Sequence, residues 1–183
     1  KPRSSSVSAG QVLTEPSTWE RGRLIVREMA DLMALDLVDK GLTTDQLVLT
    51  VGYDIANLRD PGIRSSYRGD ITRDAYGREV PKHAHGTVNL PEHTASTMEL
   101  LKAVTELYER ITAPDLLIRR LTLCANRLAP EQSPGAVCCQ MDLFASAEEN
   151  QRKARMLERE KRRQQAMLDI RRRYGKNAIV KGM

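Results

Sequence analysis

Ser17-Thr18-Trp19-Glu20 and Ser96-Thr97-Met98-Glu99 share the pattern S-T-x-E. This pattern is known as the capping box. Its serine side chain caps the first turn of a helix, and its glutamate side chain reaches back to the backbone N–H of the serine. Apolar residues at helical spacing follow each tetrapeptide, and the two segments end at Lys40-Gly41 and before Pro114. The sequence therefore predicts two helices, each beginning at a capping box. Their apolar positions are Leu24, Ile25, Met29, Leu32, Met33 and Leu37 in the first helix and Leu100, Leu101, Val104, Leu107, Tyr108 and Ile111 in the second.

Strand-like segments precede and follow both predicted helices, at residues 4–13, 46–53, 85–90 and 117–125. In these segments apolar residues alternate with polar ones, which gives each strand one apolar and one polar face. A sheet made of such strands is covered by helices on one side only. The order β-α-β-β-α-β therefore predicts an α+β sandwich, ferredoxin-like or closely related, with four strands, two helices on one face and an open polar face.

Two further segments lie between and after these units. Residues 55–82 are rich in Arg, Asp, Gly and Tyr without periodicity, so we expect a long excursion between central strands, with a hairpin around Tyr76-Gly77. Ser146-Ala147-Glu148-Glu149 is a third capping box, and the helix that it opens is expected to run to about Arg173 and to close at Gly175. The predicted divisions are a domain at 1–130, a linker at 131–145 and a basic helix and tail at 146–183.

The net positive charge of the 183-residue chain comes entirely from its C-terminal segment. Residues 1–144 carry 17 Lys and Arg against 19 Asp and Glu, a net charge of −2, whereas residues 145–183 carry 12 against 5, a net charge of +7. An anion-binding surface on the body must therefore come from local arrangement.

Composition excludes a membrane-spanning protein, because no apolar run approaches the roughly 18 residues of a span. Three cysteines, two of them adjacent at Cys138 and Cys139, form no disulfide framework and favour a reducing, cytoplasmic setting. The chain begins with Lys1 rather than Met, which is expected for a piece of a longer protein.

Catalytic motifs are absent from the sequence. It has no phosphate-binding glycine loop and no serine in a G-x-S-x-G setting. His83 and His85 share a strand face, but with His93 they lack a thiol or carboxylate at metal-ligand spacing. We therefore expect no catalytic residue, no metal ion and no cofactor in this chain.

Short polar and basic side chains gather on the predicted open face: Gln46, Thr50, His85, Thr87, Arg120 and Thr122, together with the serines Ser4, Ser5, Ser6 and Ser8. Hydroxyls, backbone N–H groups and a few cations suit contacts with the sugar-phosphate backbone of a nucleic acid. An ordinary solvated face is an equal alternative on these residues alone. Aromatic residues for base stacking are missing there, which argues against a reader of single strands.

Gln140-Met141-Asp142-Leu143-Phe144 places the chain's only Phe next to Leu in the predicted linker. Exposed apolar pairs in such segments often fill a partner's pocket. The alternative is that Leu143 and Phe144 fold back onto the domain or the last helix. We favour the first interpretation, in which Leu143 and Phe144 anchor a partner protein.

Together, these residues resemble the C-terminal part of Y-family translesion DNA polymerases, the UmuC/DinB-like group also called ImpB/MucB/SamB. The resemblance is strongest at the serine-rich residues 4–11, 45–54 (DQLVLTVGYD), 81–87 (PKHAHGT), 118–122 (IRRLT) and 169–178 (DIRRRYGKNA). It implies the little finger domain, whose open sheet docks in the DNA major groove and holds both backbones of the primer-template duplex.

The resemblance also implies which residues bind. Contacts with DNA are expected from Ser4, Ser6, Ser8, His85, Thr87, Arg119, Arg120 and Thr122, although alternation turns Arg119 partly away from the open face. Cys124 stands where some relatives carry a second arginine. The pentapeptide is similar to the family's sliding-clamp motif Q-L-x-L-F, which implies β clamp contacts from Gln140, Met141, Asp142, Leu143 and Phe144, with the last two as anchors.

The family's catalytic carboxylates and their two Mg²⁺ ions belong to the palm domain, which is expected upstream with the fingers and thumb. By itself the chain is not expected to polymerise DNA, whereas its parent would be an error-prone lesion-bypass DNA polymerase. A protein-interaction module that docks on another repair protein is the alternative from a different class.

Overall fold

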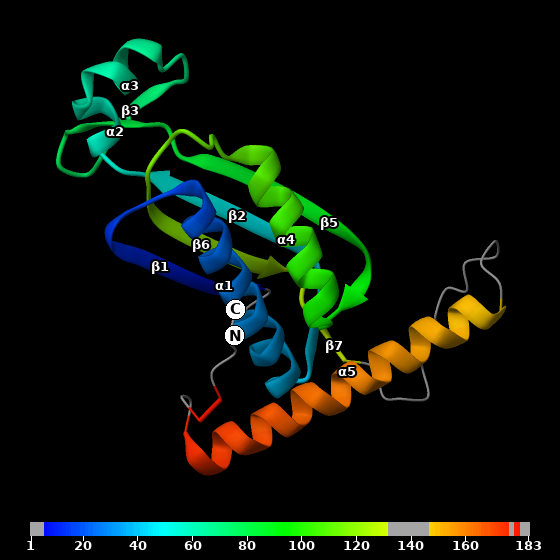
Figure 1. The fold of residues 1–183 in the computed structure, drawn as a ribbon. Helices are drawn as coiled ribbons and strands as arrows, with labels where there is room; N and C mark the ends of the chain where they lie inside the picture. Colours follow the sequence, from blue (N-terminus) through cyan, green and yellow to red (C-terminus); the bar gives the residue numbers. More distant parts are fainter. Residues whose placement is uncertain (1–5, 132–146, 176–177, 180–183) are drawn as a thin grey trace, which may run out of the picture.

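Two β-α-β units form the body of the protein, in the predicted order (Figure 1). The computed structural model describes residues 6–131, 147–175 and 178–179. The first unit is β1 (Ser6–Ser17), α1 (Trp19–Asp39) and β2 (Leu42–Tyr53), and the second is β5 (Ala84–Thr94), α4 (Thr97–Ile111) and β6 (Ile118–Asn126). Both helices pack on one face of the sheet that these strands form. The predicted α+β sandwich is confirmed.

The strand order in the sheet is β1-β6-β2-β5, and every neighbouring pair is antiparallel. Because β6 returns between β1 and β2, β5 lies at an edge. The prediction that residues 55–82 connect two central strands is therefore wrong, since they lead from central β2 to edge β5. Burial agrees with this order: Leu121 and Leu123 of β6 are fully buried, whereas Val88 and Leu90 of β5 are only partly buried. A short β7 (Ala129–Pro130) pairs with the start of β2.

The core lies between the two helices and the central strands. Leu47, Leu49 and Val51 of β2 are fully buried, as their alternation predicts. Leu24 and Leu32 of α1, which the sequence placed on the apolar face, are instead 43% and 51% exposed. The buried stripe of α1 includes alanines in their place, and small side chains let the helix lie close to the sheet. The buried residues of α1 are Gly22, Val26, Met29, Ala30, Met33, Ala34, Leu35 and Leu37.

The two helices are capped by different residues of the repeated tetrapeptide. Thr18 caps α1, and its hydroxyl accepts a hydrogen bond from the Arg21 N–H at 3.4 Å. The prediction that Ser17 is the cap is wrong, because β1 continues to Ser17 and pairing with β6 holds this residue in the sheet. α4 begins at the predicted cap, since the Ser96 hydroxyl accepts a hydrogen bond from the Glu99 N–H at 3.3 Å. The second half of the predicted capping box is wrong, because the Ser96 N–H donates to the Thr94 hydroxyl at 3.0 Å instead of to Glu99.

Two glycines mark the places where the helices lie closest to their neighbours. A Cβ atom on Gly22 of α1 would lie 2.5 Å from Cδ1 of Ile118 and 2.5 Å from the hydroxyl oxygen of Tyr108. A Cβ atom on Gly86 of β5 would lie 2.7 Å from Cγ2 of Ile111 in α4. These distances are far below ordinary carbon contacts, so both close approaches require glycine.

Residues 56–81 form a small lobe beyond one end of the sheet (Figure 1). It contains α2 (Ala56–Arg59), α3 (Pro61–Ser66), β3 (Ile71–Arg73) and β4 (Glu79–Pro81). The last two pair as the predicted hairpin, and Gly77 adopts a φ of +74° in its turn. The Asp74 carboxylate accepts hydrogen bonds from the N–H groups of Tyr76 and Arg78. The hydrogen bond from the Arg78 side chain lowers the pKa of Asp74.

α5 (Ala147–Tyr174) is the predicted C-terminal helix, and it ends at Gly175, whose φ is +93°. It lies across the end of the body at which α4 begins (Figure 1). Its contacts are largely polar: Glu160 and Gln164 are each 5% exposed. Gln164 Nε2 donates to the Ala95 carbonyl at 3.0 Å and to the Thr97 hydroxyl at 2.9 Å. Within the described residues, no helix is both long and apolar enough to cross a bilayer.

Candidate nucleic-acid interface

The open face of the sheet presents its side chains in rows that run across the strands, which we call the open-face rows. Their members, in the order β1, β6, β2 and β5, are Ser6, Asn126, Gln46 and Asn89; Ser8, Cys124, Val48 and Thr87; Gly10, Thr122, Thr50 and His85; and, without β5, Val12, Arg120 and Gly52. None of these residues is acidic. The face therefore offers hydroxyl, amide and cationic groups without a carboxylate that would repel an anion.

The structure brings most of the predicted DNA-contact residues onto these rows. They are Ser6, Ser8, His85, Thr87, Arg120 and Thr122. Ser4 and the pentapeptide at residues 140–144 lie outside the described residues. Arg119 is described but belongs to no row.

A chain of side-chain amides orders the first open-face row. Asn126 Nδ2 donates to Gln46 Oε1 at 3.2 Å, and Gln46 Nε2 donates to Asn89 Oδ1 at 2.9 Å. Of these three amides, only Gln46 was among the residues predicted for the open face. Asn89 and Asn126 were missed. Alternation could have identified them, because each lies an even number of positions from a predicted open-face residue on its own strand and therefore points to the same face.

His85 is held by its neighbour in the third row. Its Nδ1 lies 3.0 Å from the Thr50 hydroxyl oxygen, and Nε2 has no partner among the described residues. On the same strand, the Thr87 carbonyl accepts a hydrogen bond from Arg110 Nη2 at 3.0 Å. In the described part of the chain, no three His, Cys, Asp or Glu side chains come together as metal ligands would.

A β-bulge separates Arg119 from Arg120. Along β6, the pairing with β2 passes from Arg120 opposite Gly52 to Ile118 opposite Tyr53, so Arg119 is the extra residue. Strict alternation would place Ile118 on the open face, because residues two positions apart share a face of a strand. The bulge shifts the phase by one residue, so Ile118 instead faces the core, where it is fully buried.

The two arginines consequently have different surroundings. Arg119 Nη1 donates to the Thr14 carbonyl at 2.9 Å, and its Nε lies 3.7 Å from Oδ2 of Asp54. Arg120 is exposed on the open face and makes no ion pair with any described residue. Of the two, Arg120 is therefore the cation that an anion on the open face can reach without competition.

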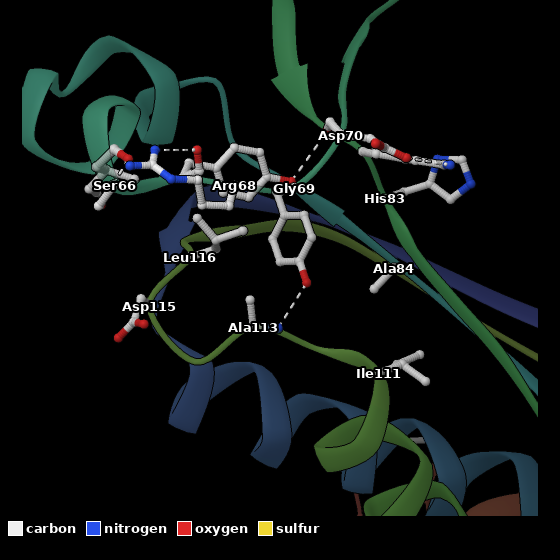
Figure 2. A pocket seen from close by; sticks show the side chains of 14 residues that line it. Ser66, Arg68, Gly69, Asp70, His83, Ala84, Ile111, Ala113, Asp115 and Leu116 are labelled. Carbon is white, nitrogen blue, oxygen red and sulfur yellow. Dashed lines mark hydrogen bonds and ion pairs between the residues drawn. The ribbon is translucent and has the colours of Figure 1, made fainter.

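A hollow of about 560 Å³ lies between the 56–81 lobe and the adjoining ends of β5 and α4 (Figure 2). Burial raises the pKa of Tyr53 and of Tyr67 in its wall. The Tyr53 hydroxyl accepts a hydrogen bond from the Ala113 N–H at 3.1 Å, and the Tyr67 hydroxyl donates to the Asp70 carbonyl at 3.1 Å. Among the described residues that line the hollow, no hydrogen bond joins a nucleophilic hydroxyl to a basic side chain, so the hollow lacks the arrangement of a catalytic site.

A family model described as the impB/mucB/samB family C-terminal domain matches residues 4–143. The chain belongs to this family. It is a little finger domain of the Y-family translesion polymerases, as its resemblance to them implied. The open-face rows are thus the uncovered sheet surface of a little finger domain.

A solved structure described as "Complex of beta-clamp processivity factor and little finger domain of PolIV" is similar to this little finger. It is 10% identical, with a TM-score of 0.42, over 70% of this chain and 93% of that chain. A comparison with curated proteins finds no match.

Proposed function

We propose that this little finger holds primer-template duplex DNA on its open face, as part of an error-prone lesion-bypass polymerase in the cytoplasm. The observation that carries the proposal is the set of open-face rows, which are largely polar, contain no acidic residue and include Arg120, a cation that forms no ion pair with any described residue. The proposed contact residues are Ser4, Ser6, Ser8, His85, Thr87, Arg119, Arg120 and Thr122.

The chemistry of the rows favours contacts with the DNA backbone over contacts with bases. Hydroxyls, amides and guanidinium groups bind phosphate oxygens, which positions a duplex without reading its sequence. The rows contain no Phe, Tyr or Trp side chain on which a base could stack. We therefore expect binding that is indifferent to sequence and sensitive to salt.

Titration of the 183-residue chain with a random-sequence duplex at several salt concentrations tests this proposal. Arg120→Ala should weaken binding and reduce the slope of log affinity against log salt by about 0.9, the value for one phosphate contact. Lys102→Ala is the matched control, because Lys102 is exposed on α4, on the covered side of the sheet. Absence of duplex binding even at low salt would instead favour a protein-interaction module.

We also propose that the pentapeptide Gln140, Met141, Asp142, Leu143 and Phe144 tethers the polymerase to the β sliding clamp. A tether of this kind raises the local concentration of the polymerase at the primer end without adding DNA contacts. The double variant Leu143→Ala, Phe144→Ala should lose clamp binding and keep its DNA affinity. Cys138→Ala with Cys139→Ala, in the same segment, should keep both, and retained clamp binding by the first variant would refute the tether.

Polymerisation is proposed to reside in palm, fingers and thumb domains outside this chain, with Mg²⁺ held by the palm. The described residues do not fit that metal centre, because they bring no three possible ligands together. We therefore assign no catalytic residue here, and the chain alone should not extend a primer.

A further inference from the structure

α5 presents two different faces. The face against the body contains the buried side chains of Glu160, Gln164 and Leu168, which follow one another at intervals of four residues. A row on the outward side consists of Arg155, Arg159 and Arg163, which we call the arginine row. All three are exposed, and their spacing of four residues places them on one side of the helix.

The arginine row is not neutralised by the described carboxylates of α5. Glu158 pairs with Arg162, Asp169 pairs with Arg172, and Glu160 is turned into the contact with α4. No ion pair within the described residues involves a member of the arginine row.

Like charges four residues apart on a helix destabilise it. The arginine row contains two such pairs, Arg155 with Arg159 and Arg159 with Arg163. A solvated helix face would more commonly mix both signs of charge. The row is therefore suited to an external anion that offsets this repulsion.

We infer that the arginine row is a second binding surface for the phosphate backbone of duplex DNA, separate from the open-face rows. Eight residues at 1.5 Å each place Arg155 and Arg163 about 12 Å apart, close to the width of the major groove. The two outer arginines of the row can thus reach phosphates on both sides of one groove, and each guanidinium offers paired donors to phosphate oxygens.

A protein partner fits this surface less well. Protein interfaces have an apolar centre with charge at the rim. On this face three cations follow one another along the helix, and the exposed apolar side chains Met156 and Ile170 lie beside them rather than in a buried centre. Because α5 packs against α1 and the start of α4, the row does not share the open face of the sheet. DNA held there occupies a different surface from DNA held by Arg120.

The experiment compares two double variants of the 183-residue chain that lose the same charge. Arg159→Gln with Arg163→Gln removes two members of the arginine row, and Arg21→Gln with Lys102→Gln removes two exposed cations from α1 and α4. With a random-sequence duplex, the first variant should reduce the salt slope by about 1.8, because each lost phosphate contact removes about 0.9. Arg159→Lys with Arg163→Lys should retain the slope.

Equal slopes for the two glutamine variants would overturn the inference. Combination with Arg120→Ala separates it from the proposed function: if both surfaces bind, the losses of binding free energy should add. An effect of the arginine-row variant without any effect of Arg120→Ala would refute the open-face proposal alone. The reverse result would refute the arginine row alone.

Discussion

Replacing Glu160 with alanine tests how α5 is held on the body. Oε2 of Glu160 accepts a hydrogen bond from the Ser96 hydroxyl at 2.7 Å, and Oε1 accepts one from the Met98 N–H at 3.0 Å. The carboxylate thus occupies the N-terminus of α4, where free N–H groups and the helix dipole favour negative charge. Its removal should therefore weaken the contact between α5 and α4.

The size of the effect follows from two opposing terms. A hydrogen bond to a charged group contributes about 1.5–3 kcal/mol, so two contribute about 3–6 kcal/mol. Burial of the carboxylate opposes this by several kcal/mol. We expect Glu160→Ala to weaken docking of α5 by about 2–3 kcal/mol, which corresponds to a change of about 30- to 150-fold in the docking equilibrium.

Hydrogen exchange of the backbone amides at residues 157–171 measures this change, because opening of α5 exposes them. They should exchange faster by that factor in Glu160→Ala. Glu158→Ala is the matched control, since Glu158 lies on the same helix and forms only an exposed ion pair with Arg162, worth at most about 0.5 kcal/mol. Equal exchange in the two variants would refute the reasoning.

Three further changes test the body of the domain. Gly22→Ala should lower the free energy of unfolding, measured in urea, by about 1–3 kcal/mol through overlap with Tyr108. Gly10→Ala is the control and should change this free energy far less, because its new Cβ would have its nearest neighbour at 3.7 Å. Equal losses in the two variants would contradict the close approach at Gly22. Thr18→Ala should lower it by about 1 kcal/mol and Ser17→Ala by less than half as much, because Thr18 is the cap; the opposite order would identify Ser17 as the cap. Burial raises the pKa of Tyr108 above the ordinary value of about 10, so the folded state favours the protonated phenol. The contribution of Tyr108 to the free energy of unfolding should therefore be complete below about pH 10 and fall at higher pH. Tyr108→Phe should reduce that fall in alkaline urea titrations, and an unchanged fall would exclude Tyr108 as its source.

The sequence was sufficient to predict features that depend on neighbouring residues alone. Alternation in residues 46–53 predicted which side chains of β2 are buried, and the Ser96 capping box predicted the start of α4. The polar character of the open face followed from the same alternation. The alignment of Thr50 with His85 and Thr122 in one row depends on the register between strands, which no single segment of the sequence specifies.

Features that depend on distant contacts were beyond local patterns. Glu160 binds Ser96 across 64 positions of sequence, and only the packing of α5 brings them together. The cap of α1 shifted to Thr18 because strand pairing extends β1. The bulge at Arg119 arises from the match between β6 and β2, so the different surroundings of the two arginines could not be read from either strand alone.

The outer edge of β5 has a consequence for how molecules of this protein meet one another. Between the pairs Thr44–Thr94 and Gln46–Asn89, β5 advances five positions while β2 advances two, so β5 bulges near Pro91. Proline also has no N–H to donate to a neighbouring strand. Further along, Arg110 already occupies the Thr87 carbonyl. Edge-to-edge joining of two sheets is hindered at both places, which protects the domain against aggregation when it is concentrated.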